Sequence, residues 1–151
     1  MTMDSFEEML QQKHLKRTKA RVLILKTLSE SLPLTAGEIF EIVHAKEPKL
    51  SLSTVYRNCE ALAVKGMLLR STMMNDGLAR YEFPRGNHVE HAVCLACRKI
   101  FPVEVALEDQ YQEKIMGQYG FETLKQRVEL YGFCEECRTN GKQKAHLAEE
   151  L

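Results

Sequence analysis

Four cysteines arranged as two Cys-x-x-Cys pairs are the residues best suited to bind a metal in this 151-residue chain. Cys94 and Cys97 form the first pair, and Cys134 and Cys137 form the second. Each pair can place two thiolates on a tight turn, and two pairs supply the four soft ligands of a closed tetrahedral zinc site. Because such a site leaves no coordination position open, the pattern predicts a structural Zn²⁺ that stabilises the fold.

The cysteine pairs also have a redox interpretation, in which one pair acts as a thioredoxin-like disulfide. The residues between the cysteines are Leu95 and Ala96 in one pair and two glutamates in the other, which is not the Pro-containing or aromatic-rich context usual for that activity. The fifth cysteine, Cys59, lies between Val55 and Leu62 on the apolar face of a predicted helix. We interpret it as a core thiol.

Composition and the N-terminal segment exclude several classes of protein. The chain is 44% hydrophobic and 28% charged, which is a globular profile. Its N-terminus is acidic where a secretory signal would be basic and then apolar, and no stretch approaches 18 apolar residues. We therefore expect a cytoplasmic protein with no membrane association. The sequence has no Ser/His/Asp constellation and no phosphate-binding loop, so no enzyme activity is predicted.

Three helices followed by a hairpin are predicted in the first half of the chain. Thr18, Thr35 and Ser51 or Ser53 can each cap a helix N-terminus, and apolar residues recur at helical spacing after each of them. A short helix over 5–13 can precede these three. The segments 67–74 and 78–83 flank an Asp-Gly dipeptide, which is typical of a hairpin. This order predicts a winged helix-turn-helix domain over 1–84.

The third predicted helix presents a polar face that could read DNA. Opposite its apolar residues, toward the N-terminal half of the helix, lie Ser53, Thr54, Tyr56, Arg57 and Glu60. A guanidinium can bind guanine or phosphate, an aromatic ring can pack on a thymine methyl, and helix-start hydroxyls lie where amides attract phosphate. Lys16 and Arg21 are two of six basic residues over 13–26, a segment with no acidic residue. They would anchor the DNA backbone or reach a minor groove. The alternative is a merely solvated polar face.

The second half of the chain predicts a small α/β unit. After a hinge over 85–91, strands are expected near 92–93, 99–103 and 121–133, with a helix over 107–119 between the last two and a polar, mobile tail from Arg138. A unit of this size over 92–151 needs a zinc staple and a dimer partner to be stable. Residues 1–70 carry 11 basic and 8 acidic residues, whereas residues 87–151 carry 8 and 11. The predicted class is therefore α+β, with a basic helical domain and an acidic, zinc-stapled dimerisation domain.

Four motifs in this order resemble the ferric uptake regulator (Fur) superfamily of metal- or peroxide-responsive repressors. They are LKRT at 15–18 with Arg21, LSTVYRN at 52–58 with Leu62 and Gly66, HAVCLACRKI at 91–100, and YGFCEEC at 131–137. The resemblance covers about residues 10–138. It implies a homodimer that binds palindromic double-stranded DNA operators, with Tyr56 and Arg57 contacting DNA and Lys16 and Arg21 assisting.

The same resemblance implies a regulatory metal site near the hinge, but with ligands missing. Glu82 and His91 occupy family ligand positions, whereas Pro33 and Pro102 stand where a histidine and a carboxylate are usual, and Glu104 is the nearest substitute for the latter. A second family site would use His88, Glu90 and Asp109, and its last histidine is replaced by Gln126. Oxygen and nitrogen ligands suit Fe²⁺, Mn²⁺ or Zn²⁺. A hydrophilic hinge without metal is the alternative for these residues.

The sequence therefore predicts a homodimeric, sequence-specific transcriptional repressor with a structural zinc and a metal or peroxide response. A thiol redox protein and a zinc-dependent interaction module are the alternatives from other classes. Within the family, a metal-independent regulator with a degenerate sensing site is the alternative.

Overall fold

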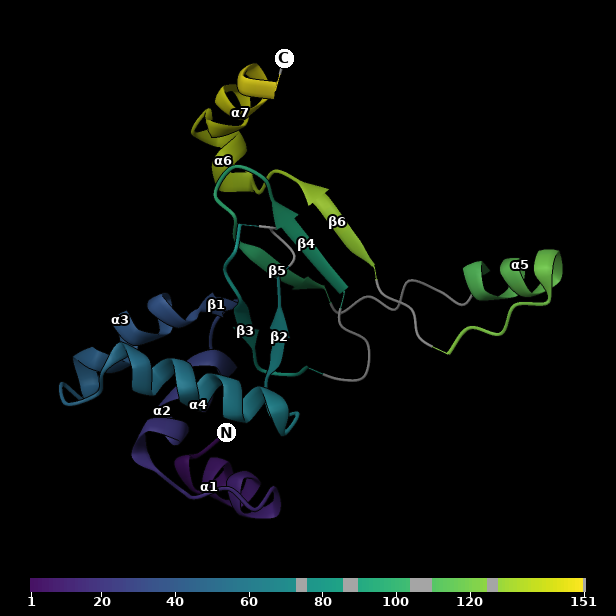
Figure 1. The fold of residues 1–151 in the computed structure, drawn as a ribbon. Helices are drawn as coiled ribbons and strands as arrows, with labels where there is room; N and C mark the ends of the chain where they lie inside the picture. The colour runs from purple at the N-terminus through teal and green to yellow at the C-terminus, as the bar shows by residue number, and fades with distance from the viewer. Residues whose placement is uncertain (73–75, 86–89, 104–109, 125–127, 151) are drawn as a thin grey trace. The chain divides into compact units, whose positions relative to one another are not determined.

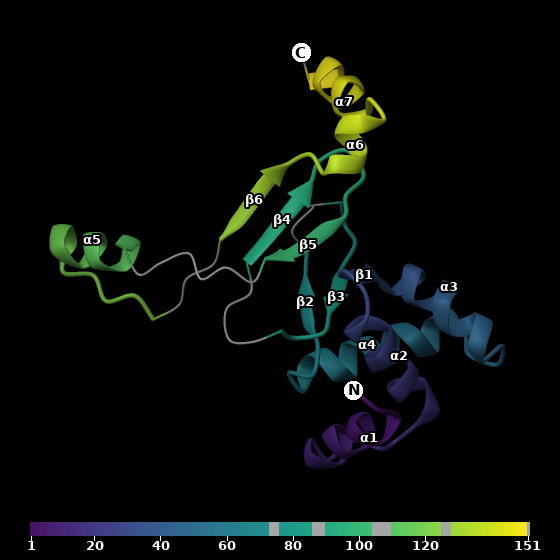
Figure 2. The ribbon, with the colours of Figure 1, turned by 180° about the vertical axis from the view of Figure 1, so that it is seen from behind.

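The computed structural model describes residues 1–72, 76–85, 90–103, 110–124 and 128–150 in two compact units, Met1–Pro84 and Arg85–Leu151 (Figure 1; Figure 2). The helices are α1 (Met3–Gln12), α2 (Lys19–Ser29), α3 (Ala36–Lys46), α4 (Leu52–Val64), α5 (Gln110–Tyr119), α6 (Glu135–Thr139) and α7 (Lys142–Glu150). The strands are β1 (Leu34–Thr35), β2 (Leu69–Ser71), β3 (Arg80–Glu82), β4 (Glu90–Cys94), β5 (Ile100–Val103) and β6 (Glu129–Gly132).

Helices α2, α3 and α4 begin where the sequence predicts, whereas α1 begins at Met3, two residues before the expected segment 5–13. The hydroxyls of Thr18, Thr35 and Ser51 accept hydrogen bonds from first-turn amides of α2, α3 and α4. At α3 the capping box is complete, because the Glu38 carboxylate accepts from the Thr35 amide at 2.8 Å. After α4 the chain turns at Gly66, whose φ of +73° suits glycine.

Apolar side chains of all four N-terminal helices meet in one core. Helix α2 lies at its centre and is apolar on several faces, as expected for a buried helix. Its buried apolar residues are Ala20, Val22, Leu23, Ile24, Leu25 and Leu28. Helix α4 contributes Val55, Cys59 and Leu62, and α1 contributes Phe6 and Leu10. Full burial of one such large side chain stabilises the fold by about 1.5–3 kcal/mol, so packing holds α4 in place.

The sheet of the first unit has the strand order β1-β3-β2, and both pairings are antiparallel. Strands β2 and β3 form the hairpin that we call the wing. β3 is central, and its Tyr81 is fully buried. Three helices, α2 to α4, followed by this wing confirm the predicted winged helix-turn-helix order, and the mixed helix and strand content of the chain confirms the predicted α+β class.

The second unit is built on a sheet of order β5-β4-β6. β4 pairs antiparallel with β5 and parallel with β6. Figure 1 shows the chain passing from β6 directly into α6 and then α7, in yellow. The polar tail predicted from Arg138 thus contains α7, where His146 packs edge to face on Phe133 with ring centroids 5.5 Å apart. The sequence did not predict this helix, and the mobility of the tail stays a prediction.

The bounds of several strands and of one helix differ from those predicted. β1 was not predicted, and β2 is shorter than the expected segment 67–74, of which 73–74 lie outside the described residues. The expected helix over 107–119 is described from Gln110 onward. None of the described helices combines the length and the apolar composition needed to cross a membrane.

Candidate metal centre and nucleic-acid interface

The sheet of the second unit brings the two cysteine pairs together. Cys94 ends β4 and Cys97 lies in the turn after it, whereas Cys134 caps the N-terminus of α6 and Cys137 lies within that helix. Cys94 is the register partner of Gly132 in the parallel β4–β6 pairing. That pairing places the second cysteine pair beside the end of β4.

Distances between the sulfur atoms fit a tetrahedral zinc site. With Zn–S bonds of about 2.3 Å, tetrahedral geometry requires S···S separations of about 3.8 Å. The Sγ atoms of Cys97 and Cys134 lie 3.9 Å apart, and all four sulfurs lie within 4.8 Å of one another. Cys94 and Cys137 are buried, whereas Cys97 and Cys134 are half-buried. Four converging thiols with this spacing fit the structural Zn²⁺ that the sequence predicts.

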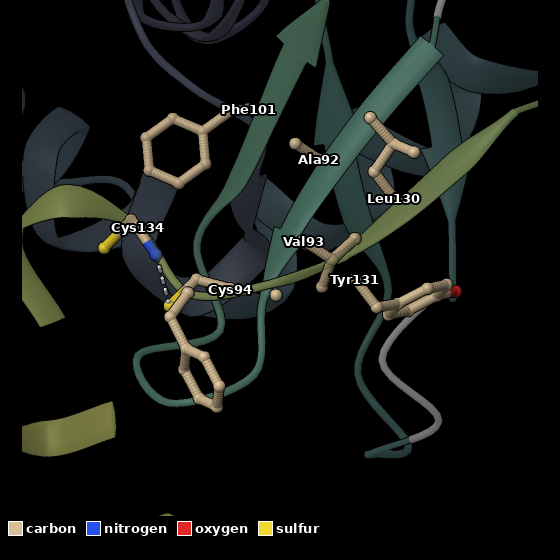
Figure 3. A pocket seen from close by; sticks show the side chains of 9 residues that line it. Ala92, Val93, Cys94, Phe101, Leu130, Tyr131 and Cys134 are labelled. Carbon is tan, nitrogen blue, oxygen red and sulfur yellow. Dashed lines mark hydrogen bonds between the residues drawn. The ribbon is translucent and has the colours of Figure 1, made fainter. Parts of the chain in front are cut away.

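Backbone amides support the cluster. The Cys134 amide donates to the Cys94 sulfur at 3.4 Å, drawn as a dashed line in Figure 3. Burial alone would raise the pKa of the Cys94 thiol, but backbone N–H groups of Cys97, Cys134 and Ala96 lower it to about 6. Burial raises the pKa of Cys97, and it raises that of Cys137 to about 12. Zinc must displace the proton of each thiol that is still protonated, so its binding depends on pH.

A surface ion pair links the two cysteine segments. Lys99 donates from Nζ to the Glu136 carboxylate at 3.2 Å. Both side chains are more than half exposed, so solvent screens the pair and it contributes little to stability. Between this lysine and Cys97, Arg98 adopts a left-handed φ of +65°, which closes the turn. The metal, rather than these contacts, is what would hold the segments together.

The predicted DNA-reading residues lie along the N-terminal half of α4. Ser53, Tyr56 and Arg57 are exposed, and Thr54 is half-buried. Tyr56 is 48% exposed, an unusual placement for so large a ring on a helix that packs its other face into the core. Among the residues that the structure describes, Arg57 makes one hydrogen bond, a long 3.4 Å bond from its Nε to the Ser53 carbonyl. Its guanidinium is therefore available to a ligand.

Hydroxyl groups cluster at the start of the same helix. Ser51 Oγ lies 3.1 Å from Ser53 Oγ and 2.9 Å from Thr54 Oγ1, and it accepts from the Thr54 amide at 3.2 Å. Hydroxyls and first-turn amides at a helix N-terminus are groups that bind phosphate oxygens. The helix start thus has the chemistry of a DNA-backbone contact.

The Arg21 side chain makes hydrogen bonds within the first unit, whereas the Lys16 side chain is exposed. The Arg21 guanidinium donates to Asn58 Oδ1 at 3.0 Å and to the Lys16 carbonyl at 3.1 Å, and Asn58 Nδ2 donates to the Thr54 carbonyl at 2.9 Å. Arg21 therefore helps to hold α4, and its contact with DNA stays a prediction. Lys16 is exposed, and its contact with DNA likewise stays a prediction.

The sequence did not predict a hydrogen-bond network around the Glu60 carboxylate on α4. Glu60 accepts hydrogen bonds from Arg70 on β2, at 3.0 Å, and from the Tyr81 phenol on β3. The bond from Tyr81 is the largest cause that lowers the pKa of the Glu60 carboxyl, and burial is the largest cause that raises the pKa of Tyr81. The sequence placed Glu60 on the polar face, but nothing in its spacing identified partners on two strands.

The candidate regulatory-metal residues are divided between the two units. Glu82 lies on β3, and Glu90 and His91 begin β4; all three are less than 10% exposed. In the β4–β5 pairing, His91 stands directly opposite Pro102, which has no ligand atom where the resemblance implies a carboxylate. His88, Glu104 and Asp109 lie outside the described residues. The ligand set of a regulatory metal therefore stays a prediction.

A pocket in the second unit is apolar. Ala92, Val93, Phe101 and Leu130 line it, and Cys94 and Cys134 lie at its edge (Figure 3). Apart from the cysteines, Tyr131 is the one lining residue that can exchange a proton. Within the described part of the chain, this lining provides no acid–base pair of the kind that hydrolytic catalysis uses.

Comparisons with known proteins agree with the zinc cluster and the helix-turn-helix. The chain matches the Ferric uptake regulator family over residues 12–131. It is 30% identical over 131 residues to the peroxide operon regulator of Bacillus subtilis (strain 168), covering 86% of this chain and 89% of that protein. It is 30% identical over 148 residues to the ferric uptake regulation protein of Campylobacter jejuni, covering 96% and 93% of the two chains.

The fold is also that of a solved structure. The ferric uptake regulator Fur of Helicobacter pylori superposes with a TM-score of 0.75 at 24% identity, covering 91% of this chain and 95% of that one. Both 30% identical relatives align over most of their own length, and the family match spans both units of the chain. The chain therefore belongs to the ferric uptake regulator family.

Proposed function

We propose that this protein is a homodimeric, sequence-specific transcriptional repressor with a structural zinc, and that it responds to a metal ion or to peroxide. The observation that carries the proposal is the exposed half of α4, where Tyr56, Arg57 and the Ser51–Thr54 hydroxyls face away from the core. Its family membership supports the same function, because relatives bear the names of peroxide and ferric uptake regulators.

DNA recognition follows from the chemistry of that face. Arg57 can donate two hydrogen bonds to a guanine edge, and the Tyr56 ring can pack on a thymine methyl. The hydroxyls of Ser53 and Thr54, with Lys16 and Arg21, supply phosphate contacts that fix the register of the helix on the duplex. A homodimer presents two copies of α4, so its operator is a palindrome whose half-sites are spaced by about one helical turn, roughly 34 Å, or a multiple of it.

The proposed role of the zinc is structural and not catalytic. When bound, Zn²⁺ is held by Cys94, Cys97, Cys134 and Cys137 in a closed site, which stabilises the second unit by the free energy of metal binding. The second unit then serves as the dimerisation domain. This arrangement supports a regulator over an enzyme, because four thiolates leave no open position for a substrate.

We assign the response to a metal ion to a second metal site, which binds its metal more weakly than the four cysteines bind zinc. We propose that the second family set, His88, Glu90 and Asp109, supplies further ligands, and that Glu82, His91 and Glu104 supply the ligands of this site for Fe²⁺, Mn²⁺ or Zn²⁺. Pro102 opposite His91 removes one donor from this set, so the affinity for metal is expected to be lower than in a complete site. A metal that binds one arrangement of the dimer more tightly shifts the population toward that arrangement.

The test is selection of DNA by the full-length protein. Zinc-loaded protein is incubated with a pool of randomised duplexes under four conditions: no added metal, Fe²⁺ without oxygen, Mn²⁺ and Zn²⁺. Enrichment of one two-fold symmetric sequence supports the proposal, and enrichment that needs an added metal supports the regulatory site. Equal enrichment without added metal identifies a metal-independent regulator. No enrichment under any condition contradicts the proposed function.

A further inference from the structure

Glu60 on α4 joins the helix to both strands of the wing. One of its carboxylate oxygens, Oε1, accepts from Arg70 Nε on β2 at 3.0 Å and from the Tyr81 phenol on β3. Arg70 and Tyr81 stand directly opposite each other in the β2–β3 pairing, so their side chains leave the same face of the sheet. A single oxygen atom therefore connects three elements of the first unit.

Tyr56 is a neighbour of this network. Tyr56 lies one turn before Glu60 on the same helix, at the spacing where side chains meet. Its phenol makes the smallest contribution to the lowering of the Glu60 carboxyl pKa, which the Tyr81 bond dominates. Because the Tyr56 ring is 48% exposed, the Glu60 carboxylate one turn away is in a position to influence its orientation.

A negative charge at this position opposes DNA binding by simple electrostatics. The Glu60 side chain is 33% exposed, and the Arg70 side chain is 44% exposed. If Glu60 were only a surface charge, replacing it with glutamine would reduce repulsion from phosphates and free Arg70, so DNA would bind more tightly. If Glu60 instead holds other residues in place, the same replacement weakens binding. The two roles therefore predict effects of opposite sign.

We infer that Glu60 is a positioning residue of the DNA interface, which orients the Tyr56 ring and the Arg70 guanidinium toward DNA and fixes α4 to the wing. The inference rests on the proposed function, because it requires α4 to be the DNA-reading helix. It also adds Arg70, from the wing, to the residues that meet the DNA backbone.

The experiment compares Glu60→Gln with Glu41→Gln in the full-length, zinc-loaded protein. Glu41 is an exposed carboxyl on α3 and is the matched control for loss of one negative charge. Affinity is measured for a duplex that the parent protein selects, at one fixed salt concentration, and melting temperatures are measured in parallel. Glu60→Gln is expected to weaken binding about tenfold, which corresponds to about 1.4 kcal/mol. Glu41→Gln is expected to leave affinity unchanged or to raise it slightly.

A second variant keeps the test decisive if Glu60→Gln does not fold. Tyr81 is fully buried, so Tyr81→Phe removes one hydroxyl that cannot touch DNA. It is expected to weaken binding about threefold in the parent and to have no further effect when Glu60 or Tyr56 is already replaced, by Glu60→Gln or Tyr56→Phe, because coupled residues are not additive.

Three results separate the possibilities. Unchanged or tighter binding by folded Glu60→Gln overturns the inference, and so does an effect of Tyr81→Phe that adds fully to that of Tyr56→Phe. Weaker binding with non-additive effects supports it. A parent protein that selects no duplex refutes the proposed function itself, and this outcome is distinct from the other two.

Discussion

Arg21 on α2 donates from its Nε atom to the side-chain oxygen of Asn58 on α4 at 3.0 Å, across 37 positions of sequence. The same guanidinium donates to the Lys16 carbonyl at 3.1 Å, and the Asn58 amide donates to the Thr54 carbonyl at 2.9 Å. These bonds connect the loop before α2, the core helix α2 and helix α4. The orientation of α4 is therefore held by a polar link as well as by core packing.

Arg21→Lys is expected to lower the free energy of unfolding by about 1 kcal/mol, because an ammonium group cannot reproduce the fixed fork that binds two acceptors at once. Arg17→Lys is the matched control, since Arg17 is exposed and lies 3.9 Å from the Glu7 carboxylate. Urea unfolding followed by circular dichroism measures both. Equal stability of the two variants would show that the Arg21–Asn58 bond contributes nothing to holding the helices.

Local signals predicted the starts of α2, α3 and α4, because a capping hydroxyl acts on amides within three residues of itself. Thr18, Thr35 and Ser51 all cap as predicted. The two-residue strand β1 was missed because its partners, Arg80 and Tyr81, define it rather than any pattern of its own. Alternating apolar and polar residues, together with turn-forming residues, predicted where the other strands lie but predicted their first and last residues less accurately.

The two parts of the site differ in how far sequence could predict them. Two short cysteine pairs fix the type and number of zinc ligands, and the parallel β4–β6 pairing then places them. The contacts of Glu60 could not be predicted, because Arg70 and Tyr81 lie 10 and 21 positions away and meet it only after the wing folds. The spacing of residues along the sequence does not show which side chains meet in the folded protein.

Cys94→Ser is expected to remove the zinc and to lower the melting temperature of the protein, because three thiolates no longer close the tetrahedral site. Cys59→Ala is the control: Cys59 is fully buried in the core of the first unit and is not one of the four clustered cysteines, so this variant is expected to keep its zinc. Metal analysis after dialysis against a chelator gives zinc per chain. Full zinc content in Cys94→Ser would contradict the structural site.

Thiol reactivity distinguishes a zinc protein from a redox protein. In the zinc-bound protein at about pH 8, none of the five cysteines is expected to react rapidly with a thiol reagent, because four bind metal and burial raises the pKa of Cys59 to about 12. A chelator is expected to expose four thiols, and a denaturant the fifth. A rapidly reacting pair without chelator would favour the redox alternative.

Acid is expected to reduce the stability advantage of the parent over Glu60→Gln. Hydrogen bonds, first from Tyr81 and then from Arg70, lower the pKa of the Glu60 carboxyl below its ordinary value of 4.5. A carboxyl with a lowered folded pKa adds stability above its unfolded pKa and loses that contribution as the pH falls through the folded value. Urea unfolding of both proteins from about pH 7 down to about pH 3.5 measures the difference. A constant difference would show that Glu60 does not ionise differently on folding.

Sequence reading by α4 is tested most directly by one affinity ratio, for the selected duplex against a shuffled duplex of equal length and composition at the same salt concentration. The parent is expected to bind the selected duplex at least about 1,000-fold more tightly. Arg57→Ala is expected to lose about 1–3 kcal/mol on the selected duplex, much less on the shuffled one, and to fold normally. Equal affinity of the parent for both duplexes under every metal condition would contradict a DNA-reading function for this helix.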